Sequence, residues 1–422
     1  MSFLSQDEAL LVHHLFKEYY RSSRGREIFE PRFIERREFG YMPFGQKVLV
    51  RHLGFKDMNE LKRAIERITP LHVYRSAALY HFPTAPMGEK GWIGAELIFD
   101  IDADHLPTRC KKEHDFAYCP SCGTILEYGS KTCAGCGSQE VRKVEWVCEG
   151  CISAARTELL KLMDFLENDF DIKPEDMVIS FSGNRGYHLA VYSDDVLELD
   201  RVARQEIVEY LTATNMDISF HGLALRSKLR EAVPDYTDYG WRGRLARSAY
   251  EVLTLVRQGN QETRDKLLEL LSEEDLNELE EISPLWSERA RWDTLKTKKA
   301  ARHVKQDQLS AVIKHAIERS IANIDNVVTM DVHRLLRLSN TLNGKTGLLA
   351  AVMPYDQLQE INPFEYFAVL PEEPTINLWV VSSPRFSLAG NIYGPYRNER
   401  VKLPAYAAAY LLCKGVARLA EH

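Results

Sequence analysis

Seven of the eight cysteines of this 422-residue chain fall within residues 109–151, and no other feature constrains the fold as strongly. Two Cys-x-x-Cys pairs, each followed by glycine, stand ten residues apart in this segment. Pairs at this spacing are typical of a zinc ribbon, in which four thiolates hold one tetrahedral ion. The sequence therefore predicts a structural Zn²⁺ site made of Cys119, Cys122, Cys133 and Cys136.

Four further potential ligands flank this ribbon: Cys110, His114, Cys148 and Cys151. They are expected to close a second Zn²⁺ site, from which the ribbon emerges as an insertion. The alternative is that some of them are ordinary buried side chains, and it weighs more for His114 than for the cysteines. Four protein ligands leave no open coordination position, so both sites are interpreted as structural.

The composition is that of a soluble globular protein, with 45% hydrophobic and 27% charged residues. No stretch approaches the roughly 20 apolar residues that cross a bilayer, and the N-terminus lacks the pattern of a secretion signal. We therefore expect a cytoplasmic protein that does not contact membranes. The net charge of −7 disfavours a nucleic-acid coat protein but leaves room for a local basic groove.

Hydrophobic spacing predicts helices and strands that alternate along most of the chain. Helices are expected within the first 30 residues and at Met58–Ile68, Ser153–Phe170, Asp200–Thr212 and Ala405–Leu419. Strands are expected at Lys47–Leu53, Ala95–Ala103, Met177–Ser182, Asn326–Met330, Leu348–Met353 and Asn377–Val381. This alternation predicts an α/β (α+β) core in which a sheet carries the chemistry.

The predicted core is interrupted twice. Residues 1–108, 152–216 and 316–422 are assigned to the core, and residues 109–151 to the zinc-binding module. Residues 217–315 are interpreted as a mostly helical insertion, because leucine-rich and charge-rich segments dominate there.

Asp100 and Asp102 lie in an otherwise apolar, strand-like run. Alternate side chains of a strand share a face, with α-carbons about 6.5–7 Å apart. Two adjacent carboxylates repel each other unless a cation lies between them, and Mg²⁺ or Mn²⁺ prefers such oxygen ligands. A solvated strand face is the alternative, but unpaired charges in an apolar strand favour a metal site.

A glycine-containing turn, Ser182-Gly-Asn-Arg185-Gly-Tyr-His188, follows the strand predicted at 177–182. Its glycines allow backbone amides to approach an anion, and Arg185 can bind phosphate oxygens bidentately. Ser182 adds a hydroxyl donor, and His188 is expected on a second strand. A plain hairpin with exposed Arg185 and His188 is the alternative.

A second polar stretch runs from Asp325 to Gly347. Asp325, before a predicted short strand, is a candidate third metal ligand, and Asp331 is the second choice. Arg334 and Arg337 are three residues apart and are predicted to share a helix face.

Together, these motifs resemble the small, catalytic subunit of archaeal/eukaryotic-type DNA primase over residues 19–352, and an archaeal member best. The resemblance implies the primase catalytic core with a mixed sheet, and a polymerase that makes short primers on single-stranded DNA from nucleoside triphosphates. It also implies a large partner subunit with an iron–sulfur domain, and catalysis by two Mg²⁺ or Mn²⁺ ions.

By motif position, the resemblance assigns Asp100, Asp102 and Asp325 to the catalytic metals. It assigns nucleotide contacts to Arg51, Ser182, Arg185, His188, Arg337 and the position of Asn343. The family zinc ligands correspond to Cys110, His114, Cys148 and Cys151. Asn343 is a departure, since the family carries histidine there. An amide cannot carry positive charge, so weaker nucleotide binding is expected than a histidine would give.

Two other functions stay open at this stage. One is a non-catalytic zinc-ribbon scaffold that binds nucleic acid, and metal-dependent nucleotide incorporation would distinguish it. The other is a repair primase-polymerase, which a preference for deoxyribonucleotides over ribonucleotides would indicate.

Overall fold

The computed structural model describes residues 4–217, 234–282 and 305–420. The chain forms two compact units, and the division falls within helices α4 (Glu149–Asn168) and α6 (Arg201–Leu211). The first unit comprises Met1–Leu159, Pro174–Gln205 and Ile324–His422, and the second comprises Leu160–Lys173 and Glu206–Asn323.

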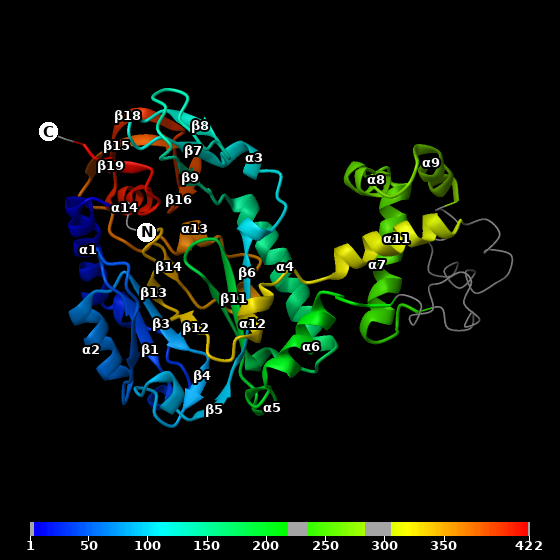
Figure 1. Cartoon of the computed structure of the whole chain (residues 1–422), viewed down its shortest axis with the longest axis horizontal. Coiled ribbons are helices and arrows are strands. Elements are labelled where there is room, and N and C mark those ends of the chain that lie inside the picture. The colour runs from blue at the N-terminus through cyan, green and yellow to red at the C-terminus, as the bar shows by residue number, and fades with distance from the viewer. Residues whose placement is uncertain (1–3, 218–233, 283–304, 421–422) are drawn as a thin grey trace. The chain divides into compact units, whose positions relative to one another are not determined.

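An antiparallel four-stranded sheet forms one part of the first unit. Its strands, in order across the sheet, are β12 (Leu335–Arg337), β3 (His72–Ser76), β1 (Phe39–Met42) and β2 (Val50–Leu53). Helices α1 (Gln6–Arg21) and α2 (Met58–Ile68) belong to the same region (Figure 1). The α2 boundaries match the expectation, because the Asp57 side chain caps the helix by accepting a hydrogen bond from the Glu60 amide.

A second antiparallel sheet carries the polar motifs and consists of β10 (Met177–Phe181), β11 (Gly186–Val191) and β6 (Leu97–Asp102). In β6, the side chains of Phe99 and Ile101 are buried, whereas Asp100 and Asp102 are partly exposed. Helix α12 (Asn326–Met330) packs against β6 (Figure 1). The strand expected at 326–330 is therefore wrong. Asp325 caps this segment as a helix by accepting hydrogen bonds from the amides of Val327 and Val328.

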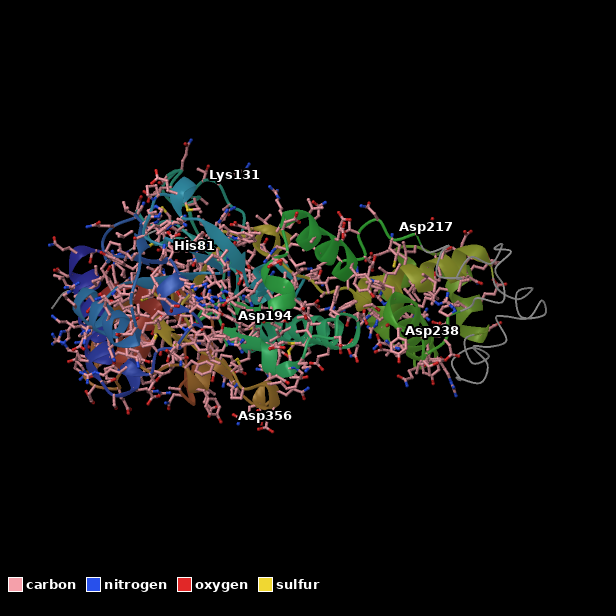
Figure 2. The ribbon with its side chains drawn as sticks, turned by 90° about the horizontal axis from the view of Figure 1, so that it is seen from below. His81, Lys131, Asp194, Asp217, Asp238 and Asp356 are labelled. Atoms are coloured by element: carbon pink, nitrogen blue, oxygen red, sulfur yellow. The ribbon has the colours of Figure 1, made fainter. Side chains whose placement is uncertain are left out.

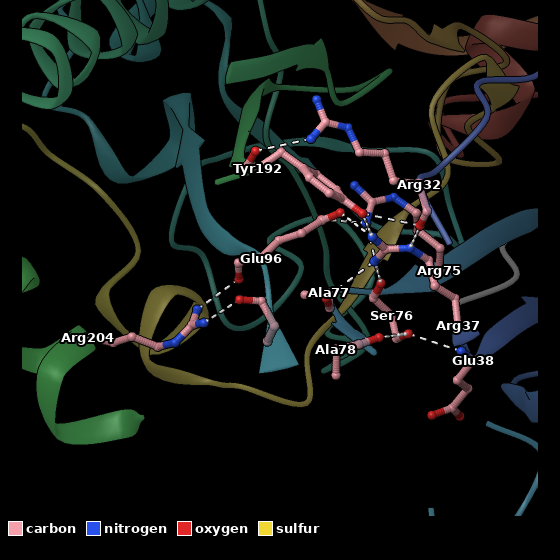
Figure 3. Close-up of polar contacts among 11 residues, drawn as sticks. Arg32, Arg37, Glu38, Arg75, Ser76, Ala77, Ala78, Glu96, Tyr192 and Arg204 are labelled. Atoms are coloured by element: carbon pink, nitrogen blue, oxygen red, sulfur yellow. Dashed lines mark hydrogen bonds and ion pairs between the residues drawn. The ribbon is translucent and has the colours of Figure 1, made fainter. Parts of the chain in front are cut away.

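A buried charge network fixes the position of β6 (Figure 3). The fully buried Glu96, directly before β6, accepts hydrogen bonds from Arg37 and Arg75, both at 2.6 Å. Arg204 donates to the carbonyl oxygens of Ala95 and Glu96 at 2.7 and 2.8 Å. Since Arg37 precedes β1 and Arg75 lies in β3, the network ties the strand that carries the aspartates to the other sheet.

The cysteine-rich segment folds as α3 (Lys111–His114) and a small sheet in the order β8 (Ile125–Glu127), β7 (Phe116–Tyr118), β9 (Arg142–Val144). Lys131, between the two cysteine pairs of the ribbon, is exposed at the surface (Figure 2). The Tyr118 hydroxyl donates to the Gly415 carbonyl, which connects this module to the C-terminal region.

The C-terminal region pairs β18 (Tyr396–Leu403), β15 (Ile376–Ser383) and β19 (Ala417–Leu419), with helix α14 (Ala405–Cys413) nearby. The helix expected to reach Leu419 ends at Cys413, because the chain turns at Gly415 with φ of 70° and continues as β19. The remaining elements of this unit are β4 (Ala78–Tyr80), β5 (Trp92–Ala95), α5 (Asp194–Leu197), β13 (Thr341–Leu342), β14 (Leu349–Ala350), α13 (Pro363–Tyr366), β16 (Phe386–Leu388) and β17 (Asn391–Tyr393).

The second unit is helical where it is described, with α7 (Gly240–Arg257), α8 (Gln261–Leu268), α9 (Glu273–Ile282) and α11 (Gln306–Ser320). Arg244 is its central polar residue: it donates to Asp169 at 2.8 Å and lies over the Phe165 ring. Parts of the segment predicted as a helical insertion, residues 218–233 and 283–304, lie outside the described residues. Among the described residues, none of the helices combines the length and apolar character needed to span a bilayer. The mixed α/β fold expected from the sequence is confirmed.

Candidate active site and metal centres

Three aspartates meet at the end of the second sheet. Asp100 and Asp102 project from the same face of β6, with side chains only 18% and 20% exposed. The backbone amide of Asp325 donates to the Asp100 carbonyl at 2.9 Å, which brings the cap of α12 beside the strand. The structure thus brings together the three carboxylates that the motifs assign to metal binding.

The Asp100 carboxylate lies in an environment that suits a cation. Burial raises its pKa, the neighbouring Asp102 and Asp325 add to the rise, and His188 opposes it. Its Oδ1 is buried without a hydrogen-bond partner and lies 3.5 Å from His188 Nε2. His188 and Asp100 are opposite each other in the β11–β6 pair. A divalent cation would compensate both the missing partner and the mutual repulsion.

Arg185 connects the carboxylates of this site. Its guanidinium contacts Asp102 at 3.0 Å, Asp104 at 2.7 Å and Glu145 at 3.4 Å. Burial lowers the pKa of Arg185, but these carboxylates outweigh burial and raise it overall. Asp104 and Glu145 were not assigned from sequence. For Asp104 the signal was present, since it continues the Asp-x-Asp pattern by one further step.

The Ser182 turn is held by its own hydroxyl and by a second loop. Ser182 Oγ accepts from the backbone amides of Arg185 and Gly186 at 3.3 and 3.1 Å. Gly183 has φ of 75°, and a Cβ there would come within 2.8 Å of the Asn343 side chain. The Asn343 amide, 2% exposed, donates to the Ser182 carbonyl at 2.8 Å and accepts from the Lys345 backbone amide at 2.9 Å. Asn343 therefore positions the turn.

Arg334 and Arg337 do not share a helix face, because Arg337 lies in strand β12 and Arg334 directly precedes it. Both arginines nevertheless line the same cavity as Asp100 and His188 of the three-stranded sheet. Arg337 contacts His72 Nδ1 at 2.8 Å and lies over the Tyr74 ring. Burial, followed by Arg337 and Lys345, lowers the pKa of His72 to about 2, so His72 is neutral and accepts from the guanidinium.

The cavity beside Asp100 and Asp102, called here the aspartate cavity, has a volume of about 230 Å³. It is lined by Tyr74, Asp100, Asp102, Ser182, Asn184, Arg185, His188, Val328, Arg334, Leu335, Leu336, Arg337, Asn343 and Lys345. The lining thus combines two carboxylates with four cationic side chains, Arg185, Arg334, Arg337 and Lys345. Such a site suits a metal-bound polyphosphate.

Two residues named from sequence lie elsewhere. Arg51, in β2, donates to the buried Glu38 at 2.9 and 3.2 Å and does not line the aspartate cavity. Asp331 also does not line it, and its carboxylate accepts from the His333 amide. Asp325 does not line it either, but its charge raises the pKa of Asp100, so Asp325 is the better third carboxylate.

Two cysteine-rich sets each bring four ligand atoms within 4.8 Å of one another. Among the described residues, no other group of histidine, cysteine or carboxylate ligand atoms lies so close together. The three aspartates do not meet this distance. The sets are Cys110, His114, Cys148 and Cys151, and Cys119, Cys122, Cys133 and Cys136. Both sets could hold zinc, and this grouping is the one expected from the spacing.

A hydrogen bond orients the histidine of the first set. Asp115 lies 2.8 Å from His114 Nδ1, and His114 Nε2 points at Cys151 Sγ, 3.3 Å away. A carboxylate on the far nitrogen is the usual support of a metal-binding histidine. The same carboxylate accepts from the Trp146 amide, which fixes it to the segment that follows β9.

The fold and the sites define an α/β protein with an acidic and cationic cavity beside a cysteine-rich, metal-binding module. Comparison with known proteins gives the family. The family model described as DNA primase small subunit matches residues 138–354. The chain is 31% identical over 426 residues to the DNA primase small subunit PriS of Cenarchaeum symbiosum, covering 99% of this chain and 100% of that protein.

Other archaeal relatives agree. The protein of the same name from Nitrosopumilus maritimus is 29% identical over 99% of this chain and 100% of its own length. That from Methanococcoides burtonii is 30% identical over 95% and 96%. The chain belongs to the DNA primase small subunit family, and the resemblance expected from its motifs is confirmed.

Proposed function

We infer that this chain is the catalytic subunit of a DNA primase, which synthesises short RNA primers on single-stranded DNA by nucleotidyl transfer. Family membership supports the activity, and one structural observation supports its location. That observation is that Asp100 and Asp102 line one cavity with the cationic Ser182 turn, while the backbone amide of Asp325 is bonded to the Asp100 carbonyl. A zinc-ribbon scaffold without activity would not need a half-buried acidic cluster at this point.

Asp100, Asp102 and Asp325 would hold the two catalytic Mg²⁺ or Mn²⁺ ions. When bound, these ions supply Lewis acidity that lowers the pKa of the attacking hydroxyl and offsets charge on the leaving group. The unpartnered Oδ1 of Asp100 and the mutual repulsion of the carboxylates support this role. Cys110, His114, Cys148 and Cys151, with the four ribbon cysteines, would hold structural Zn²⁺.

The cationic side chains bind the nucleoside triphosphate. Arg185, Arg337 and His188 line the cavity and are placed to contact phosphate oxygens. Ser182 and Asn343 act mainly by shaping the turn that carries Arg185. Arg51 is bound to Glu38 and does not line this cavity, so we do not assign it a phosphate contact.

In the reaction, the 3′-hydroxyl of the primer, or of the first nucleotide, attacks the α-phosphorus of the incoming nucleotide in line. A P–O bond forms, the bond to the β-phosphate breaks, and its electron pair leaves on pyrophosphate. The hydroxyl proton passes to solvent. Arg185 and Arg337 neutralise the triphosphate as charge develops on the leaving oxygen.

The chain acts with a large partner subunit, as the word "small" in its relatives' names suggests, and on a single-stranded DNA template. Template-dependent incorporation of each nucleotide type on a homopolymer tests the activity. Asp100→Ala and Asp102→Ala are expected to abolish synthesis without change in zinc content or melting temperature. Synthesis by the double variant would contradict the assignment. A preference for deoxyribonucleotides would instead indicate a repair primase-polymerase.

A further inference from the structure

The C-terminal sheet β18-β15-β19 has one face that is covered and one that is open. Helix α14 packs against β15 and β19 (Figure 1), and Leu378 and Val380 of β15 are fully buried. Alternate residues of a strand point to opposite faces, so Trp379 lies on the face away from this core. Trp379 is partly exposed there.

The strand register places an arginine on each side of Trp379. Arg400 of β18 and Arg418 of β19 are its direct partners in the two neighbouring strands. Directly opposite residues of antiparallel strands share a face, with Cβ atoms about 4.5–5.5 Å apart. Lys402 lies two residues along β18 from Arg400 and therefore on the same face. All three cationic residues are exposed, and together with Trp379 they are called here the Trp379 face.

The cations of the Trp379 face have no counter-charge. Among the described residues, none forms an ion pair with Arg400, Arg418 or Lys402. Glu399 does not supply one from its strand position, because it pairs with the buried Val380 and so belongs to the covered face. In a chain of net charge −7, this local concentration of positive charge favours an anionic partner.

The Trp379 ring is not already paired. In the part of the chain that the structure describes, no aromatic ring stacks on it and no cationic group lies over it. An exposed aromatic ring flanked by cations suits single-stranded nucleic acid, in which a base stacks on the ring and the cations bind the phosphates. Stacking requires a base whose face is free, and this excludes the interior of a duplex.

We propose that the Trp379 face binds single-stranded DNA and is a second contact for the template, outside the aspartate cavity. Trp379 stacks on a base, and Arg400, Arg418 and Lys402 bind phosphates of the same strand. The proposal rests on the proposed function, which makes single-stranded DNA the template. None of the four residues lines the aspartate cavity, so the Trp379 face acts on template binding and not on bond formation.

Fluorescence anisotropy with labelled oligo(dT) tests the proposal on the full chain, in buffer without nucleotide or added divalent cation. Trp379→Leu removes the ring and keeps an apolar side chain. Arg400→Gln and Arg418→Gln each remove one charge at an exposed position, where the change does not endanger folding. Arg397→Gln is the matched control, because Arg397 is an exposed arginine of the same strand that pairs with the buried Ser382 on the covered face.

Trp379→Leu is expected to weaken oligo(dT) binding by about fivefold or more, the effect of losing one stacked base. Arg400→Gln and Arg418→Gln should each weaken binding and lower the slope of log K against log salt by about 0.7, the value for one phosphate contact with a single strand. Arg397→Gln should change neither quantity. The KM for template in primer synthesis should rise in the variants of the Trp379 face.

Unchanged oligo(dT) binding in both Arg400→Gln and Arg418→Gln would overturn the proposal, whether or not Trp379→Leu folds. An equal loss in Arg397→Gln would also overturn it, since the effect would then follow net charge alone. If the two arginine variants bind oligo(dT) normally but no longer bind the large partner subunit, the face is a protein interface and the proposal is wrong.

Asp100→Asn separates this proposal from the proposed function. Primer synthesis that survives in Asp100→Asn would refute the catalytic assignment, whatever the variants of the Trp379 face show. Loss of synthesis in Asp100→Asn, together with unchanged oligo(dT) binding in the arginine variants, would refute the Trp379 face alone.

Discussion

Replacing Asn343 with alanine tests whether its amide positions the Ser182 turn. The amide makes a buried hydrogen bond to the Ser182 carbonyl at 2.8 Å and accepts a partly buried one from the Lys345 amide at 2.9 Å. Alanine leaves the buried Ser182 carbonyl and the partly buried Lys345 amide without these partners. At about 1–2 kcal/mol for each unsatisfied group, the free energy of unfolding should fall by about 2–4 kcal/mol.

The same substitution should displace the turn from the phosphates. Loss of about 1.4 kcal/mol of nucleotide binding corresponds to a tenfold higher KM. Urea denaturation and steady-state primer synthesis measure the two effects. Asn377→Ala, at an exposed asparagine of β15, is the control and should change neither. Unchanged stability and unchanged KM in Asn343→Ala would refute the reasoning.

Asn343→His distinguishes the positioning role from a direct phosphate contact. The resemblance to the primase family predicts that histidine at position 343 binds nucleotide more tightly than asparagine. The structure gives the amide two backbone partners, and one neutral imidazole cannot donate to Ser182 and accept from Lys345 with the same geometry. We therefore expect no fall in KM. A KM below that of the wild type would indicate that the residue at position 343 contacts a phosphate directly.

Three further predictions concern parts that support the site. Burial lowers the pKa of His72 to about 2 in the folded protein, whereas in the unfolded chain its pKa is near 6.5. Below pH 6.5 the unfolded chain therefore binds a proton that the folded protein does not, and the free energy of unfolding falls as the pH falls. Stability should decline by about 1.4 kcal/mol per pH unit below 6.5, and His72→Gln should flatten this decline; an unchanged slope would contradict it. Cys148→Ser should remove one of two zinc ions per chain in mass-spectrometric metal analysis, and loss of neither would contradict the first cysteine set. Glu96→Gln leaves two buried arginines undercompensated and should lower the free energy of unfolding by about 3–5 kcal/mol; a change below 1 kcal/mol would contradict the network.

The sequence predicted the local parts of the site well, because local physics decides them. The period of a strand places Asp100 and Asp102 on one face, and Asp57 marks the start of α2. The cysteine spacing predicted both sets of ligands, which lie together in the structure.

The wrong predictions arose where a cap or a distant strand outweighs local preference. The β-branched Val327 and Val328 favour a strand, yet the Asp325 cap makes the segment helical. Arg337 follows helical spacing, yet pairing with β3 opposite Tyr74 makes its segment a strand.

Other parts could not be predicted because they come from distant segments. Lys143 and Lys414 line one cavity from positions far apart in the chain. The packing of the cysteine-rich module on the C-terminal region brings them together. The hydrogen bond from Asn343 to the Ser182 carbonyl spans 161 residues in the same way.

The central claim is that Asp100, Asp102 and Asp325 form one metal-binding site. Metal-dependent primer synthesis by Asp325→Asn, compared with Asp331→Asn, tests it most directly, because the two aspartates lie on one short segment and only Asp325 acts on Asp100. We predict that Asp325→Asn loses synthesis while zinc content stays at the wild-type value, and that Asp331→Asn retains synthesis. Activity in Asp325→Asn, or loss only in Asp331→Asn, would contradict the account.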